Sequence, residues 1–361
     1  MDGRRKRRLG IAGAVAGLGA AGIGAAVAAR KIAVGRVRLL PDPDVNEPFG
    51  QLRGEPLTVL ADDGLALHVE IEQPPGRRPR KQLTIVFCHG YCLTQDTWHY
   101  QRRDLAGTRM VFWDQRSHGR SGRSRPSRAT IDQTGADLAA VLRATTRPGD
   151  PVLLVGHSMG GMSIMALAER SPEFFDRQVI GVGLINTSTG DIHEMTLGLP
   201  LILAKVIRPV APRVVRGLGA RKNLIDPART AGADLAFFVI RRMGFADRNI
   251  SPTLVDFVER MIRATTIDVI AEFYPALMRH DKRKSLETLT KVPILVMSGG
   301  ADQLTPRAHG ELIADSLDDA EFVGVDQAGH LLPLEHPGLV TAALRRLLAR
   351  ATGRPVEEAA S

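Results

Sequence analysis

The stretch that decides the fold is Val152-Leu-Leu-Val-Gly156-His157-Ser158-Met159-Gly160-Gly161. Its apolar start predicts a short buried strand, and the small residues after the serine predict a helix. Between them stands G-x-S-x-G, the pattern of a serine on a sharp turn from strand to helix. The flanking glycines let the backbones approach, so the Ser158 hydroxyl would stand above the sheet at a helix N-terminus. Ser158 is therefore the candidate nucleophile; a glycine-rich turn that binds a phosphate, or nothing, is the alternative.

A serine hydroxyl needs a base to remove its proton, and His330 is the candidate among the ten histidines. It ends the stretch DQAGH between the last predicted strand and the last predicted helix, so its loop would reach the sheet edge that carries Ser158. Asp302 follows the apolar run Ile294–Met297, and its carboxylate would fix the tautomer of the imidazole. The alternatives are a solvated loop histidine and an aspartate that caps the following helix. The predicted catalytic residues are Ser158, Asp302 and His330.

An oxyanion would need two backbone N–H donors, and two segments are placed to supply them. The N–H of Met159 follows the serine directly, and the second donor is expected from Tyr91 in the stretch Cys88-His-Gly-Tyr-Cys92. His157 is expected to be a packing residue because neighbours on such a turn point apart. His336 is expected to help start the last helix.

Strand and helix patterns alternate along the chain, which predicts an α/β protein with a mostly parallel sheet covered on both faces. The predicted strands are Glu55–Leu60, Leu65–Gln73, Leu83–Cys88, Arg109–Trp113, Val152–Val155, Val179–Ile185, Ile294–Met297 and Glu321–Val325. The predicted helices of the core are Ile131–Ala144, Gly160–Arg170 and Pro337–Ala349.

One long segment, residues 187–286, breaks this alternation because it has no clear strand pattern. Its helical pieces are Pro200–Ile207, Ala231–Met243, Thr253–Thr265 and Ile267–Met278. The segment is expected to form a helical cap over the carboxyl edge of the sheet, inserted between core residues 51–186 and 287–352. Residues 353–361 are expected to form a disordered tail.

The basic charge is concentrated at the N-terminus, although the whole chain carries +9 with a pI near 10. Residues 1–38 hold nine basic residues and one acidic residue, a net +8, so the remaining residues carry about +1. Aromatic residues make up 4% of the chain, too few for a platform that stacks single-stranded bases. No nucleic-acid partner is expected, and no metal or cofactor motif is found.

The N-terminus contains one uncharged apolar segment, residues 9–29, after the basic residues 1–8. As a helix it would extend about 31 Å, close to the thickness of a hydrocarbon core. A single membrane-spanning anchor is the favoured interpretation, and membrane association the expected localisation. A cleaved signal sequence and a peripheral or poorly ordered helix are the alternatives. Residues 30–50, which contain three prolines, are expected to form an extended linker.

Two cysteines, Cys88 and Cys92, are too few for a disulfide-stapled scaffold. They are expected to be small residues packed at a strand end, and a bridge between them is the alternative because they flank a turn.

Taken in order, four motifs resemble those of the α/β-hydrolase superfamily over residues 55–350. They are His89-Gly90, the stretch Asp114-Gln-Arg-Ser-His-Gly-Arg-Ser121, the stretch Gly156–Gly161, and Asp302 with His330. The second is similar to the family's D-x-R-G-x-G-x-S loop, with Ser117 where glycine is usual. The resemblance is greatest to esterase, lipase and haloperoxidase-like members that carry a helical cap.

This resemblance implies an eight-stranded α/β-hydrolase fold and a serine hydrolase that acts on small-molecule esters through an acyl-enzyme. The apolar residues of the expected cap favour lipid-like or medium-chain acyl groups. Thioester, lactone and peracid chemistry uses the same residues and stays open. A non-catalytic ligand-binding protein with this fold is an alternative of another class, and a membrane-scaffold role is a further one. The oligomeric state is left undetermined.

Overall fold

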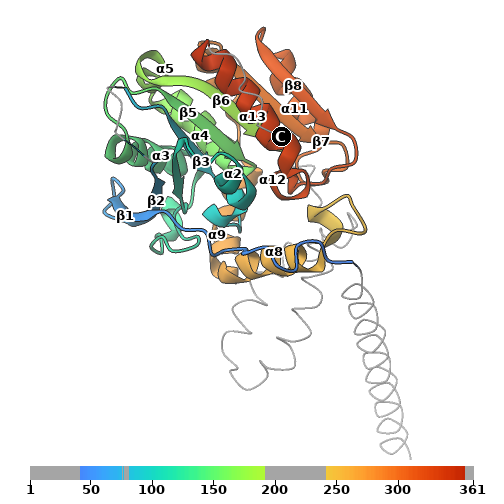
Figure 1. The fold of residues 1–361 in the computed structure, drawn as a ribbon. Helices are drawn as coiled ribbons and strands as arrows, with labels where there is room; N and C mark the ends of the chain where they lie inside the picture. Colours follow the sequence, from blue (N-terminus) through green and yellow to red (C-terminus); the bar gives the residue numbers. More distant parts are fainter. Residues whose placement is uncertain (1–40, 75, 77–80, 192–240, 354–361) are drawn as a thin grey trace, which may run out of the picture.

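The computed structural model describes residues 41–74, 76, 81–191 and 241–353. Eight strands form one sheet in the order β1-β2-β4-β3-β5-β6-β7-β8, with helices on both faces (Figure 1). The strands are β1 (Glu55–Leu60), β2 (Ala66–Glu72), β3 (Thr84–Cys88), β4 (Arg109–Trp113), β5 (Val152–His157), β6 (Val179–Ile185), β7 (Ile294–Gly299) and β8 (Ala320–Val325). Pairs β1–β2 and β2–β4 are antiparallel and the other pairs are parallel. The predicted fold is confirmed.

The central strands are continuous apolar runs because each of their faces is covered by helices. In β3, Val86 and Cys88 enter the core on one face, whereas Ile85 and Phe87 enter the core on the other. Strand β5 alternates in the same way. A strand buried on both faces has no solvent side, so polar residues stand only at the strand ends, as Thr84 does in β3 and His157 in β5.

The helices form the two outer layers and connect successive strands. They are η1 (Gln95–Trp98), α2 (His99–Asp104), η2 (Pro126–Arg128), α3 (Ile131–Thr145), α4 (Met159–Arg170), α5 (Glu173–Arg177), α8 (Pro252–Ala264), α9 (Ile267–Met278), α10 (Ser285–Leu289), α11 (Arg307–Asp315), α12 (Leu332–Glu335) and α13 (Pro337–Thr352). Helices α3, α4 and α11 pack on one face through Leu138, Ile164 and Ile313. On the other face, α12 and α13 pack through Leu332 and Leu344.

Helices α8 and α9 belong to residues 187–286, the expected cap, and lie together below the sheet in Figure 1. The chain leaves and re-enters the core at one narrow neck. There the Lys282 N–H donates to the Thr189 carbonyl at 2.6 Å, and Gly190 forms a β-bridge with Asp281. The predicted helix Pro200–Ile207, and nearly all of Ala231–Met243, lie outside the described residues.

The first described residues pack against α8 instead of standing free of the domain. Asp42 accepts hydrogen bonds from the hydroxyls of Ser251 and Thr253 at the start of α8. Phe49 stacks on Phe257 of α8 with ring centroids 4.6 Å apart. Residues 41–50 of the expected linker therefore join α8 to the core.

The expected localisation as a single-pass membrane protein is corrected. Within residues 41–353, apart from the gaps named above, no helix has both the length and the apolar character that crossing a bilayer requires. The segment to which the anchor was assigned, residues 9–29, lies outside the described residues, as do residues 354–361 of the expected tail.

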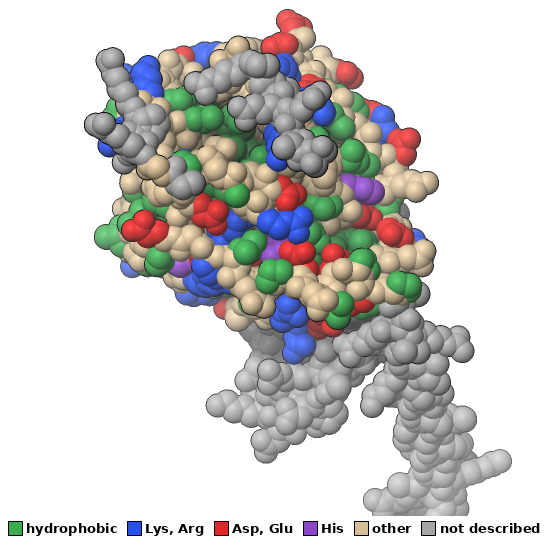
Figure 2. Space-filling view, in the orientation of Figure 1, with side chains coloured by type: hydrophobic (Ala, Val, Ile, Leu, Met, Phe, Trp, Pro, Cys, Tyr) green, Lys and Arg blue, Asp and Glu red, His purple; other side chains and the backbone are tan. Residues whose placement is uncertain are grey.

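Acidic and basic side chains are interspersed on the face shown in Figure 2, among apolar and neutral polar groups. This mixture is consistent with the near-neutral charge of the chain after residue 38.

Candidate active site

The turn between β5 and α4 has the conformation that the sequence predicts. Ser158 has φ 52° and ψ −119°, a left-handed backbone that side chains other than glycine rarely adopt. Two residues further on, only glycine fits at position 160, because a Cβ on Gly160 would lie 2.0 Å from the carbonyl oxygen of Cys88. Ser158 is 9% exposed and directly precedes the N-terminus of α4.

Asp302 and His330 are brought into direct contact beyond the ends of β7 and β8. The Nδ1 of His330 lies 2.8 Å from the Oδ2 of Asp302, and the side chain of Asp302 is fully buried. The Oδ1 of Asp302 accepts the N–H groups of Leu304 and Thr305, so the aspartate also forms the turn before α11. Burial opposes ionisation, but the charge and hydrogen bond of His330 outweigh it and hold the pKa of Asp302 below its usual range. An ionised Asp302 can accept the Nδ1–H of His330, an arrangement that would leave Nε2 facing away from the aspartate.

The loop of His330 rests on the turn that carries Ser158. The Nε2–H of His157 donates to the His330 carbonyl at 2.8 Å, and the two rings are 4.9 Å apart. His157 is thus more than the packing residue expected, because it binds the backbone of His330. Residues 158 and 330 are joined through this contact.

The two expected oxyanion donors lie on segments that touch each other. Met159 is the first residue of α4, and Tyr91 lies in the loop directly after β3. The hydroxyl of Tyr91 donates to the Ile270 carbonyl of α9 at 2.6 Å. Phe273 of α9 belongs to the apolar cluster of Met159. Helix α9 therefore covers the area beside Ser158 with apolar side chains.

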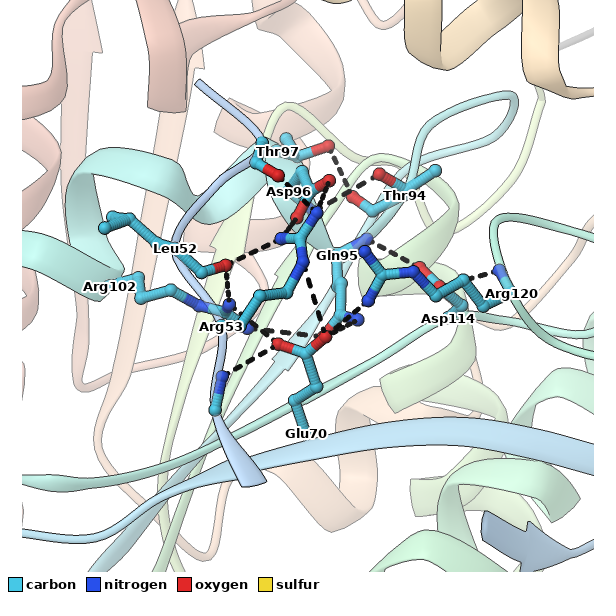
Figure 3. Close-up of polar contacts among 12 residues, drawn as sticks. Leu52, Arg53, Glu70, Thr94, Gln95, Asp96, Thr97, Arg102, Asp114 and Arg120 are labelled. Atoms are coloured by element: carbon cyan, nitrogen blue, oxygen red, sulfur yellow. Dashed lines mark hydrogen bonds and ion pairs between the residues drawn. The ribbon is translucent and has the colours of Figure 1, made fainter. Parts of the chain in front are cut away.

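A buried polar network supports the loop after β3 (Figure 3). At its centre is Glu70 of β2, which is 1% exposed. The carboxylate contacts Arg102 at 2.8 Å, Arg120 at 2.6 Å, the Gln95 amide at 3.1 Å and the Gly54 N–H at 3.0 Å. Burial alone would raise the pKa of Glu70, but its hydrogen bonds with His68 and Gly54 and the charge of Arg102 hold it far below the usual range.

Asp114 ties this network to the loop after β4. Its Oδ1 accepts the Gln95 N–H at 2.8 Å and its Oδ2 accepts the Arg120 N–H at 2.9 Å. Burial raises the pKa of Asp114 to about 6, against the effect of these two hydrogen bonds. The loops after β3 and β4 are therefore held together by one carboxylate.

The replacement Glu70→Ala is expected to lower the free energy of unfolding by about 3–5 kcal/mol, because it leaves the guanidinium of Arg102 buried without its main counter-charge. Urea denaturation monitored by circular dichroism measures the change. Glu72→Ala is the matched control: Glu72 also pairs with Arg102, at 3.2 Å, but its side chain is 23% exposed. The control should lose no more than about 1 kcal/mol. Equal losses in the two variants would contradict the central role of Glu70.

Ser117 and Cys92 have left-handed backbones, with φ of 64° and 60°. Glycine is usual at the Ser117 position of related loops because glycine adopts such a backbone without strain. Here the Ser117 hydroxyl accepts the Ser124 N–H at 2.9 Å. Cys88 and Cys92 are both free thiols, so the bridge considered as an alternative is absent between them.

Three residues that the sequence reasoning missed bind the loop of His330. Asn186 donates to the carbonyls of Gly329 and His330, and Glu335 accepts the Gly329 N–H. His157 is the third. A polar residue directly after a buried strand, as Asn186 is, was the available signal. Among the described residues, no cluster of three metal-binding side chains is found.

Fold and site together define an α/β hydrolase. Residues 85–344 match the model of the alpha/beta hydrolase family, and the chain belongs to this family. A non-heme chloroperoxidase of Streptomyces lividans is 35% identical over 267 residues, which are 72% of this chain and 89% of that protein. A monoacylglycerol lipase of Mycolicibacterium smegmatis is 26% identical over 64% of this chain and 74% of its own length.

Solved structures show the same fold. An enol-lactonase from Burkholderia xenovorans superimposes with a TM-score of 0.62 at 24% identity, over 81% of this chain and 100% of that chain. An esterase from Thermogutta terrifontis gives a TM-score of 0.60 at 23% identity, over 82% and 98%.

Proposed function

We propose that the protein is a serine hydrolase that cleaves carboxylic esters with Ser158 as nucleophile, His330 as base and Asp302 as its orienting carboxylate. The observation that carries the proposal is the 2.8 Å contact between Asp302 and His330, in a loop that rests on the turn of Ser158. The strained backbone of Ser158 supports it, because such strain is concentrated at functional sites.

The proposed reaction has two steps, formation of an acyl-enzyme on Ser158 and its hydrolysis. The Oγ of Ser158 attacks the ester carbonyl carbon while Nε2 of His330 takes the hydroxyl proton, and Asp302 stabilises the imidazolium. The N–H groups of Met159 and Tyr91 would bind the oxyanion of the tetrahedral intermediate. The C–O bond to the alcohol then breaks, and the alcohol leaves with the proton from His330. Water attacks the acyl-enzyme with the same base, which releases the acid and restores Ser158.

An apolar acyl group is the substrate feature that the surroundings support. Met159, next to the nucleophile, packs in one apolar cluster with Met162 of α4 and Val269 and Phe273 of α9. A lipase is also among the relatives. We therefore propose lipid-like or medium-chain esters as the preferred class.

A series of nitrophenyl esters from acetate to palmitate tests this proposal. We expect kcat/KM to rise from the two-carbon to the eight-carbon acyl group, because each buried methylene contributes about 0.8 kcal/mol. Thioesters, lactones and peracid formation, measured on the same preparation, are the competing activities. A maximum at acetate would contradict the proposed preference for longer acyl groups. Binding of an ester without turnover would favour the non-catalytic alternative.

A further inference from the structure

Asn186 occupies the position directly after β6, at the centre of the segments that carry the proposed triad. The residue is fully buried and has φ 44°, a left-handed backbone that asparagine tolerates better than most residues. Its own N–H continues the sheet by donating to the Met297 carbonyl at 2.9 Å. The side chain thus starts from a fixed point between β5 and β7.

The Asn186 amide joins the two loops that hold the base and the acid. Its Nδ2 donates to the carbonyls of Gly329 and His330, both at 2.8 Å. Its Oδ1 accepts the N–H of Gly299, the last residue of β7, three positions before Asp302. Both donor hydrogens and the carbonyl oxygen of the amide therefore have partners.

The residues on each side of Asn186 bind the backbone of Ser158. The carbonyl of Ile185 accepts the Ser158 N–H at 3.0 Å, and the hydroxyl of Thr187 donates to the Ser158 carbonyl at 2.8 Å. Residues 185–187 therefore contact the turn of Ser158, the segment that leads to Asp302 and the loop of His330. The proposed reaction depends on the relative placement of these three segments.

We propose that Asn186 is the positioning residue of the site: its amide holds the backbones of the base loop and the acid loop at fixed distances from Ser158. This inference rests on the proposed function of Ser158, Asp302 and His330. The side chain at position 186 must donate to two carbonyls and accept from one N–H, and it must be short enough to reach all three groups. Asparagine meets this requirement, whereas aspartate offers no donor and leucine offers neither.

The test compares Asn186→Gly and Asn186→Asp with the wild type in labelling by a fluorophosphonate probe, which reports the reactivity of Ser158 without knowledge of the substrate. Glycine tolerates the left-handed backbone, so this variant removes the side chain with its amide without straining the backbone. We expect one label per chain on Ser158 in each variant, at a rate roughly 10–100-fold lower, the cost typical of a misplaced catalytic group. For a nitrophenyl ester, kcat should fall by a similar factor while KM is maintained.

A second readout separates positioning from general destabilisation. The proton between His330 and Asp302 should give a downfield NMR resonance in the wild type, and we expect it to shift or broaden in Asn186→Gly. Arg109→Met is the matched control at the opposite edge of the sheet, where the guanidinium binds the Thr84 hydroxyl at 2.9 Å and the Thr145 carbonyl at 2.8 Å. It should lower the melting temperature and leave the labelling rate and the resonance unchanged.

The outcomes are distinguishable. Wild-type labelling rate and an unshifted resonance in Asn186→Gly would overturn the positioning role while leaving the proposed function intact. Equal slowing in Arg109→Met would also overturn it, because general instability would then explain the loss. A wild-type protein that does not label at Ser158 would overturn the proposed function and this inference with it.

Discussion

Replacing Ser158 by alanine is expected to lower kcat for ester hydrolysis by roughly 10⁴- to 10⁶-fold, the loss seen when a triad nucleophile is removed. The hydroxyl is the atom that would form the acyl-enzyme, and no neighbouring group substitutes for it in the proposed reaction. Labelling by a fluorophosphonate should disappear completely. Initial rates on a nitrophenyl ester and mass spectrometry of the labelled chain measure the two effects.

Ser171→Ala is the matched control for this prediction, because Ser171 follows the far end of the same helix, α4. It should keep wild-type labelling and wild-type kcat. Unchanged labelling in Ser158→Ala would show that another nucleophile reacts, and the proposed function would then be abandoned.

Acidification is expected to destabilise the protein steeply between about pH 6 and pH 4. Burial lowers the pKa of His89 and His157 to about 3 and of His118 and His280 to about 4. An unfolded histidine titrates near pH ~6.5, so below that value the unfolded chain binds more protons and the folded state loses stability. Asp114, whose pKa is raised to about 6, has the opposite effect, because the folded state binds this one proton at a higher pH than the unfolded chain does. The net three protons correspond to a loss on the order of 4 kcal/mol per pH unit.

Urea unfolding at pH 7, 6, 5 and 4 measures this slope. His280→Gln should reduce the slope by about one proton, because it removes one buried titratable group. The glutamine amide can still donate to the Ser188 carbonyl that His280 binds at 2.8 Å, so the contact is kept. Val269→Ala removes apolar contact without a titratable group, so its curve should lie below that of the wild type and parallel to it. A free energy of unfolding that stays constant from pH 7 to pH 5 would contradict the neutral buried histidines.

Much of the fold could be predicted from local pattern. The runs Arg109–Trp113 and Val179–Ile185 are strands with the predicted bounds, because the interior of a strand buried on both faces must be apolar. The short helix α2 was missed, since its residues His99–Asp104 are mostly polar and show no helical apolar stripe. Four of these residues are buried by contacts that no local pattern reveals: His99 with Glu47, Tyr100 with Asp44, Gln101 with the Pro333 carbonyl and Arg102 with Glu70.

The candidate site was only partly predictable. The positions of Ser158, Asp302 and His330 after three of the predicted strands suggested one sheet edge, and the structure brings Asp302 and His330 into contact. Their catalytic roles stay a proposal. Residues 192–240 of the expected cap lie outside the described residues, so the proposed acyl preference rests on the part of the cap formed by α8 and α9.

The sequence by itself determined the sharp turn at Ser158. The ten residues 152–161 contain the apolar strand, the serine and the small residues that begin the helix, so local pattern was sufficient. The tertiary structure alone decided how His330 is held. Asn186 and His330 are 144 positions apart, and His157 and His330 are 173 apart. Hydrogen bonds between such distant residues follow no sequence period; they exist because the parallel sheet places the ends of β5, β6, β7 and β8 at one edge.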